Sequence, residues 1–136
     1  MKTIIAGGRK DIYYSDIEEA INLCDWIPTQ VVCGEASGAD AFGRKWAELN
    51  SIPVNSFPAK WNDLSCSDAI IKVNSFGKKY DSRAGFRRNH QMGDYSEALI
   101  AVWDGLSRGT KDMIDYANKK GLKVFVHIPI RFQNLS

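Results

Sequence analysis

The stretch Ile4-Ile5-Ala6-Gly7-Gly8-Arg9 joins a short apolar run to two glycines and a cation. An apolar run of this length is typical of a buried strand, and the glycines permit a tight turn after it. Four later segments share the same pattern of a short apolar run next to turn-forming residues. We therefore predict strands over Lys2–Ala6, Gln30–Cys33, Ile52–Phe57, Ala98–Trp103 and Leu122–Ile128.

The segments between these strands carry helical patterns. Ser15 and Glu18 stand at the spacing of a capping box, which predicts a helix that begins there and ends before Pro28. Further helices are predicted between Asp40 and Asn50, over Phe86–Tyr95 and over Thr110–Lys120. Strands that alternate with helices are typical of βαβ units. The predicted fold class is α/β, a Rossmann-like three-layer sandwich with a mainly parallel sheet of about five strands.

The length and composition favour one soluble domain. The chain has 136 residues, which predicts a single domain over residues 1–136. Apolar residues make up 44% and charged residues 25%, values that exclude a wholly disordered chain. A net charge of +2 provides no electrostatic footprint for a duplex, so we expect no stable duplex nucleic acid as a partner.

The cysteine and histidine contents point away from metal and disulfide chemistry. Three cysteines without a CxxC pattern and only two histidines predict no disulfide framework, no metal site and no bound cofactor. The first apolar run is too short for a signal peptide, and no segment approaches the roughly 20 apolar residues of a membrane span. We therefore expect a cytoplasmic protein without a membrane partner.

The segment from 62 to 84 fits this alternation least well. We predict a short helix over Ser67–Asn74 and a polar stretch after it. The apolar residues Ala69, Ile70, Ile71 and Val73 require burial. They favour packing against the domain or contact between copies in a homo-oligomer over a mobile lid.

Three loops that follow predicted strands contain small residues, namely Gly7–Arg9, Gly34–Asp40 and Asp104–Thr110. Ligands of open parallel sheets bind beyond the carboxyl ends of the strands. Turn formation explains each loop alone, but three at one sheet edge favour a phosphate site, because backbone N–H groups and helix N-termini attract anions. The candidate ligand-binding residues in these loops are Gly7, Gly8, Arg9, Gly34, Ser37, Gly38, Asp40, Gly105, Ser107, Gly109 and Thr110.

A basic stretch between Lys78 and His90 adds two candidates, Arg88 and Asn89. The lysines at its start are typical of a solvated face. An arginine grips phosphate through two parallel hydrogen bonds, and an asparagine adds a directional amide. Trp61 either stacks on a base or packs in the core.

Five ordered motifs resemble a known family and lie at Ala6–Arg9, Gly34–Asp40, Phe57–Trp61, Ala84–Met92 and Asp104–Thr110. They are similar to the AGGR, GxxxGAD, FPADW, AGxxRNxxM and DGxSxGT motifs of the DUF2493 or YspA-like family, within the SLOG superfamily of Rossmann-like proteins. The resemblance extends from Ile4 to Ile128. Lys60 replaces the aspartate of FPADW, and the 62–84 segment is longer than the family norm.

The resemblance implies a nucleotide or a nucleotide-derived ligand. Related LOG proteins are phosphoribohydrolases that cleave the N-glycosidic bond of nucleoside monophosphates with an arginine and a glutamate. Arg88 matches their arginine, but Met113 occupies the position of their glutamate, and we expect it in the core. The candidate catalytic carboxylates are Asp104 and Asp112, since a carboxylate stabilises positive charge developing on ribose. Asp104 is equally typical of a turn.

Three functions follow from these patterns. The first is binding, for sensing or sequestration, of a nucleotide-like small molecule through the glycine-rich loops and Arg88. The alternative is a nucleotide-processing hydrolase that cleaves the N-glycosidic bond of a nucleoside monophosphate. The third is an interaction subunit whose glycine loops have only a structural role.

Overall fold

Five parallel strands form the central sheet of the computed structural model, which describes residues 1–133. They pair in the order β3-β2-β1-β6-β7. Their bounds are β1 Lys2–Gly7, β2 Gln30–Gly34, β3 Val54–Phe57, β6 Ala98–Val102 and β7 Lys123–His127. The five predicted strands and the Rossmann-like α/β fold class are therefore confirmed.

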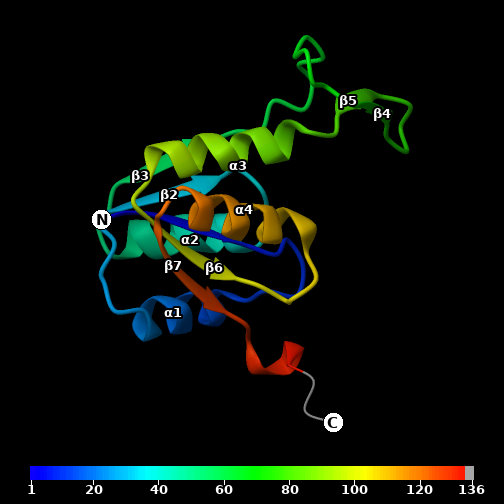
Figure 1. Ribbon diagram of the computed structural model, residues 1–136. Helices are drawn as coiled ribbons and strands as arrows, with labels where there is room; N and C mark the ends of the chain where they lie inside the picture. The colour runs from blue at the N-terminus through cyan, green and yellow to red at the C-terminus, as the bar shows by residue number, and fades with distance from the viewer. Residues whose placement is uncertain (134–136) are drawn as a thin grey trace.

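Four helices cover the two faces of this sheet (Figure 1). On one face lie α1 (Tyr14–Leu23) and α2 (Ala39–Leu49), and on the other lie α3 (Ala84–Tyr95) and α4 (Arg108–Lys119). A short 3-10 helix, η1 (Ile130–Phe132), follows β7. Within residues 1–133, none of the helices has the length and apolar character that crossing a membrane requires.

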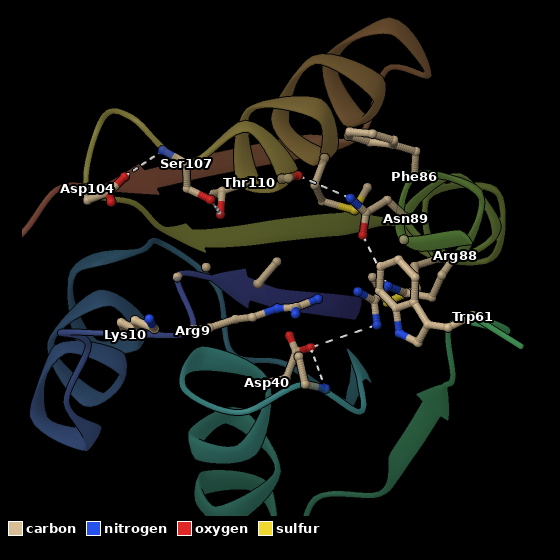
Figure 2. A pocket seen from close by; sticks show the side chains of 18 of the residues that line it. Arg9, Lys10, Asp40, Trp61, Phe86, Arg88, Asn89, Asp104, Ser107 and Thr110 are labelled. Carbon is tan, nitrogen blue, oxygen red and sulfur yellow. Dashed lines mark hydrogen bonds and ion pairs between the residues drawn. The ribbon is translucent and has the colours of Figure 1, made fainter. Parts of the chain in front are cut away.

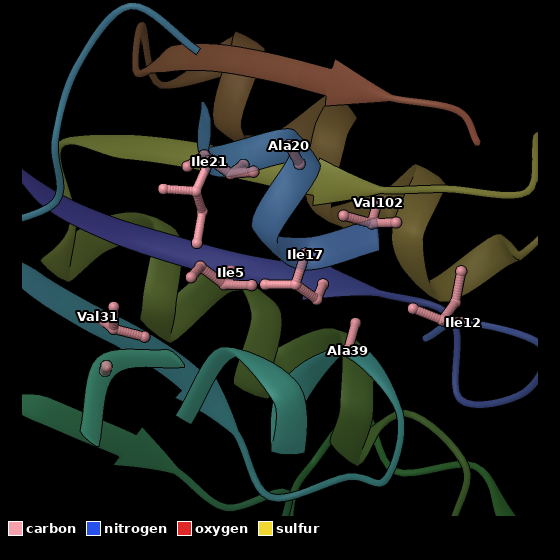
Figure 3. Packing of buried hydrophobic residues seen from close by; sticks show 10 residues of the cluster. Ile5, Ile12, Ile17, Ala20, Ile21, Val31, Ala39 and Val102 are labelled. Atoms are coloured by element: carbon pink, nitrogen blue, oxygen red, sulfur yellow. The ribbon is translucent and has the colours of Figure 1, made fainter. Parts of the chain in front are cut away.

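Neighbouring residues of β1 fill the two apolar layers, because side chains alternate along a strand. Ile5 packs with Ile17 and Ile21 of α1 (Figure 3). Ile4 points to the opposite face and packs with Met92 and Met113. The prediction that Met113 belongs to the core is confirmed, since its side chain is fully buried. With both faces covered, the carboxyl ends of the strands remain the place where the loops gather.

The N-cap of helix α1 is Tyr13, two residues before the predicted Ser15. The carboxylate of Asp16 accepts a hydrogen bond from the N–H of Tyr13 at 2.7 Å, and the N–H of Asp16 donates to the Tyr13 carbonyl at 2.9 Å. The prediction of a capping box formed by Ser15 and Glu18 is therefore wrong. Asp16 takes the position that was assigned to Glu18.

The segment from 62 to 84 contains an antiparallel hairpin of β4 (Ile71–Val73) and β5 (Lys79–Asp81). The predicted helix over Ser67–Asn74 is wrong, and the β-branched residues in this run fit the hairpin better. Ile71 and Val73 are 44% and 60% exposed, so this chain does not bury them as expected. Figure 1 shows the hairpin projecting beyond the start of α3.

Candidate functional site

A cleft of about 550 Å³ opens where the sheet order reverses, beyond the carboxyl ends of β1 and β6. Its walls come from segments that are distant in sequence: the loop after β1, the loop that leads into α2, Trp61, the first turns of α3, and the loop after β6 with the start of α4. Figure 2 shows their side chains directed toward a common space. This is the position where parallel α/β sheets bind ligands.

Glycines bring the ends of β1, β6 and α2 together at the floor of the cleft. A Cβ on Gly7 would clash with the Val102 carbonyl and would lie 2.9 Å from Cβ of Ala39. The N–H of Ala39 donates to the Gly8 carbonyl at 3.0 Å, which fastens the start of α2 to the loop after β1. Gly38 has a φ of 72°, a conformation that favours glycine. These glycines therefore shape the site through the backbone.

Arg88 of α3 reaches the cleft from the side of the sheet that holds α4. It is only 9% exposed. Its Nε donates to Oδ1 of Asn89 at 3.2 Å, and its Nη1 lies 3.9 Å from Oδ2 of Asp40. Burial lowers the pKa of Arg88, and the nearby Arg9 acts in the same direction. Arg88 is therefore a largely buried cation that, among residues 1–133, donates one side-chain hydrogen bond and lines the cleft.

Asp40 lies opposite, in the first turn of α2, and is 7% exposed. Its Oδ2 accepts a hydrogen bond from the N–H of Ala36 at 3.1 Å. Burial raises the pKa of Asp40 above its ordinary value, although Arg88 and the Ala36 N–H oppose that rise. A carboxyl group in this position takes up a proton more readily than an exposed one.

Arg9 and Trp61 form the outer part of the cleft. The guanidinium carbon of Arg9 lies 5.8 Å from the centroid of the Trp61 ring. In Figure 2, Arg9 points into the cleft toward Arg88 and Asp40. Arg9 thus brings a second cation to the cleft beside Arg88, while Trp61 supplies an aromatic surface.

The loop after β6 is organised by Asp104. Its Oδ1 accepts hydrogen bonds from the N–H groups of Leu106 and Ser107, both at 2.8 Å. The hydrogen bond from Ser107 is the largest cause, and that from Leu106 the next, that holds the pKa of Asp104 below its ordinary value. Asp104 is therefore ionised at neutral pH. Thr110 donates to the Ser107 hydroxyl at 3.3 Å. The predicted turn role of Asp104 is present, and its carboxylate also lines the cleft.

Asp112 stands behind the cleft wall, between α3 and α4. Its Oδ2 accepts from Nδ2 of Asn89 at 3.4 Å, and its Oδ1 lies 3.3 Å from Nε2 of His90. Asn89 also donates to the Gly109 carbonyl at 3.1 Å. Asp112 therefore orients Asn89 and His90, and it is not among the residues that line the cleft in the described chain.

The structure brings most of the predicted ligand-binding residues together. Those that line the main cleft are Gly7, Gly8, Arg9, Asp40, Arg88, Asn89, Ser107, Gly109 and Thr110. Ser37 lines a smaller adjoining cleft. Gly34, Gly38 and Gly105 line neither cleft in the described chain, but Gly34 lies directly beneath the Arg88 guanidinium and Gly38 lies against Gly8.

Sequence reasoning did not single out Lys10, Ser82 or Phe86, which also line the main cleft. Phe86 precedes Asn89 by three residues, and residues at this spacing share a helix face. That spacing is a signal that could have identified Phe86. Ser82 follows β5, and it lay in a stretch that was predicted only to be polar.

Comparisons with known proteins agree with the fold. No family model matches the chain. Over 65 residues, the chain is 34% identical to the uncharacterized SPbeta prophage-derived protein YoqJ of Bacillus subtilis (strain 168). The matched region covers 41% of this chain and 38% of YoqJ. The X-ray structure of DNA processing protein A (DprA) from Streptococcus pneumoniae has a TM-score of 0.66 at 16% identity, over 92% of this chain and 49% of the DprA chain.

These similarities establish a Rossmann-like fold shared with DprA. The chain spans about half of the DprA chain, at 49%, and the YoqJ match spans 38% of that protein. This fold is the α/β architecture that the sequence predicts. Membership in the SLOG superfamily and in its YspA-like family stays a prediction.

Proposed function

We propose that the protein binds a nucleotide-like ligand in the main cleft and that Arg88 receives the ligand's anionic group. The observation that carries this proposal is the state of the Arg88 guanidinium. A guanidinium has five N–H donors, and those that are not used within the protein remain available to a ligand in the cleft. Among the described residues, Arg88 donates one hydrogen bond, to Asn89, and its nearest carboxylate oxygen lies 3.9 Å away. An anion in the cleft supplies the missing acceptors.

The surroundings of Arg88 suit a phosphate group. Helix α4 begins at the cleft, and its residues Gly109 and Thr110 line the wall. The N-terminus of a helix has unpaired N–H groups and a partial positive charge, which together favour anions. Arg9 and Lys10 bring further positive charge to the same wall.

The test compares Arg88→Ala with the unchanged protein by calorimetric titration of AMP and ribose 5-phosphate. We expect Arg88→Ala to weaken both ligands by about 1.5–3 kcal/mol, the value of a hydrogen bond to a charged group. Arg83→Ala is the matched control, because it removes the same charge from an exposed side chain that pairs with Asp68 outside the cleft. Equal affinities of the Arg88→Ala and unchanged proteins would remove Arg88 from the site.

A hydrolase is the second candidate, and the position of Asp104 favours it. An ionised carboxylate in the cleft wall is suited to stabilise the positive charge that develops on ribose when an N-glycosidic bond breaks. Asp112 faces His90 and Asn89 instead, so this candidate function depends on Asp104.

The hydrolase is tested by incubating the protein with nucleoside monophosphates and measuring the free base by chromatography. Asp104→Asn removes the charge but keeps an oxygen that accepts from the N–H groups of Leu106 and Ser107. We expect this variant to lose turnover and to keep ligand binding. Absence of free base with the unchanged protein would leave binding as the function.

A further inference from the structure

A smaller cleft of about 330 Å³ adjoins the main one on the side of Trp61. The two clefts share Arg9, Ala36, Trp61 and Arg88 in their walls. The remaining wall of the smaller cleft combines apolar surface from Pro58 and Ala59 with the polar side chains of Glu35 and Ser37. A ligand anchored at Arg88 therefore has a second compartment within reach, and Trp61 borders both.

The Trp61 side chain is supported from behind by the start of α3 and by the hairpin. Its six-membered ring lies so close to Gly85 that a Cβ there would be 3.0 Å from Cη2. The edge of Tyr80 approaches it with a centroid distance of 6.3 Å and an interplanar angle of 69°. The Trp61 carbonyl accepts from the N–H of Asp81 at 2.8 Å. These contacts hold the indole in place at the border of the clefts.

The indole N–H of Trp61 differs from those of two other tryptophans. Trp26 donates to the Thr3 hydroxyl at 3.0 Å, and Trp103 donates to the Ser107 carbonyl at 3.1 Å. Among residues 1–133, the Trp61 indole nitrogen donates no hydrogen bond, and the same is true of Trp46. The half-buried side chain of Trp61 lines both clefts.

Arg9 occupies the space that a planar ligand ring would take. Its guanidinium lies 5.8 Å from the indole centroid, and Arg9 itself is exposed. A heteroaromatic ring that stacks on Trp61 replaces this contact and leaves Arg9 to face the ligand's anionic group. Glu35 and Ser37 at the rim then supply an acceptor and a donor for polar groups on the ring edge.

We propose that Trp61 is the base-stacking residue and that the ligand joins a heteroaromatic base to an anionic group. The anion lies at Arg88, and the base lies in the smaller cleft on the indole. This inference rests on the proposed function and adds the place of the base and the residue that stacks on it. Stacking of a base on an aromatic side chain contributes to affinity whatever the base, because every base has a π-face.

The experiment titrates ribose 5-phosphate and the four nucleoside 5′-monophosphates into the protein by calorimetry. We expect the best nucleotide to bind at least about tenfold more tightly than ribose 5-phosphate, the ratio for one stacked base. Trp61→Ala should lower nucleotide affinity by about the same factor and leave ribose 5-phosphate within about twofold. Trp61→Phe retains a ring and should keep much of the preference.

A spectroscopic readout accompanies the titration and does not depend on the alanine variant. Nucleotide, but not ribose 5-phosphate, should quench tryptophan fluorescence in the unchanged protein, and Trp61→Phe should abolish the quenching. Phe76→Ala is the matched control, because it removes an aromatic side chain that is 92% exposed and lies outside both clefts.

The outcomes separate this inference from the proposed function. Nucleotides and ribose 5-phosphate that bind equally, with no effect of Trp61→Ala on either, would overturn base stacking and leave the Arg88 site intact. Equal weakening of both ligand types by Trp61→Ala would also overturn it, because the indole would then act on the anion site as a whole. If neither ligand type binds, the proposed function fails and this inference fails with it.

Discussion

Asp40 and Arg88 share the deepest part of the cleft, and their proximity makes the site sensitive to pH. The carboxyl group of Asp40 has a raised pKa, with burial as the largest cause. Above that pKa, an ionised Asp40 competes with an incoming anion for the Arg88 guanidinium. Below it, the neutral carboxyl group leaves the cation to the ligand.

The pH dependence of sulfate binding tests this competition. Sulfate stays a dianion across the acidic range, so its own titration does not interfere. We expect sulfate affinity to rise as the pH falls through the raised pKa of Asp40, with uptake of a proton on binding. Isothermal titration at several pH values measures the effect, and Asp40→Asn should bind sulfate with little pH dependence over this range. The same slope in Asp40→Asn would show that another group titrates.

Gly34 keeps the floor of the cleft open for Arg88. A Cβ at this position would clash with Nη1 of Arg88 and would lie 2.6 Å from Oδ2 of Asp40. We expect Gly34→Ala to displace the guanidinium, to weaken AMP binding in calorimetric titration, and to destabilise the protein by about 1–3 kcal/mol in thermal unfolding, the usual cost of overpacking.

Gly109→Ala is the matched control for stability. No heavy atom lies within 4 Å of a Cβ at Gly109, and this residue belongs to α4. We expect it to leave stability unchanged or to raise it by up to about 1 kcal/mol, because alanine is the better helix former. Gly34→Ala with the stability and affinity of the unchanged protein would contradict the proposed role of Gly34.

Single residues of the site could be predicted where residue type and neighbouring positions in the sequence already indicate the chemistry. Arg88-Asn89 stood out because a cation and an amide follow each other in a helical segment. The position of Asp112 behind Asn89 could not be predicted, because it depends on how α3 packs against α4. The role of Gly34 was equally hidden, since a glycine that makes room for a distant arginine looks the same in sequence as a turn glycine.

At the scale of elements, the β4–β5 hairpin depends on one buried carboxylate. Asp81 is fully buried, and its Oδ1 accepts from the N–H groups of Ile70 at 3.2 Å and Arg83 at 3.0 Å. Its Oδ2 is bound by Arg87. Burial acts to raise the pKa of Asp81, but the hydrogen bonds from Arg83, Arg87 and Ile70 hold it below its ordinary value. The stability that Asp81 contributes is therefore present at neutral pH and is lost as the pH falls through that lowered pKa.

Asp81→Ala tests the anchoring of the hairpin. Removal of the carboxylate leaves two N–H groups and Nη2 of Arg87 without this acceptor, while Nε of Arg87 keeps its bond to Asp68. We expect faster amide hydrogen exchange over residues 70–83 and faster tryptic cleavage within the hairpin, while β1 and β6 keep their protection.

Asp68→Ala is the control for that experiment, since Asp68 pairs with Arg83 and Arg87 at the surface. Exposed ion pairs contribute about 0–1 kcal/mol, so we expect little change in exchange. Identical exchange of the hairpin in Asp81→Ala and the unchanged protein would show that other contacts hold it.

The sequence predicted this region poorly for a physical reason. A short apolar run such as Ala69–Val73 has no period long enough to separate a helix from a strand. The deciding interactions include the cross-strand pair of Ile71 with Asp81 and the hydrogen bond from Ile70 to Asp81, which join residues about ten positions apart. The capping box of α1 was predicted at the wrong residues for a similar reason. The Asp16 carboxylate that forms it also accepts a hydrogen bond from Arg131, which is 115 positions away in the sequence.

At the scale of the whole molecule, one sheet carries two apolar layers. The continuous apolar run of β6 is fully buried, as expected for a strand covered on both faces. This is why the α/β class could be predicted from the sequence, whereas the order of the strands follows from pairings that leave no local pattern. Both apolar layers pack against the same strands. Loss of packing in one layer should therefore also destabilise the other.

Ile4→Ala and Ile5→Ala test that dependence. Each opens a cavity in a different layer, and each should lower the free energy of unfolding by about 2–5 kcal/mol. Denaturant unfolding followed by tryptophan fluorescence and by far-UV circular dichroism should show coincident transitions in both variants. Ile130→Ala, at a side chain that is 72% exposed, should change stability by less than about 0.5 kcal/mol. Two separated transitions would mean that the layers unfold independently.

The hairpin forms its own two-stranded sheet and pairs with no strand of the central one within residues 1–133. Its turn, with Phe76 at 92% exposure, therefore offers a handle for immobilisation. A short biotin-acceptor peptide spliced between Ser75 and Gly77 would tether the protein to a sensor chip by this projecting tip. Analytes in the flow would then reach the opposite end of the domain unobstructed.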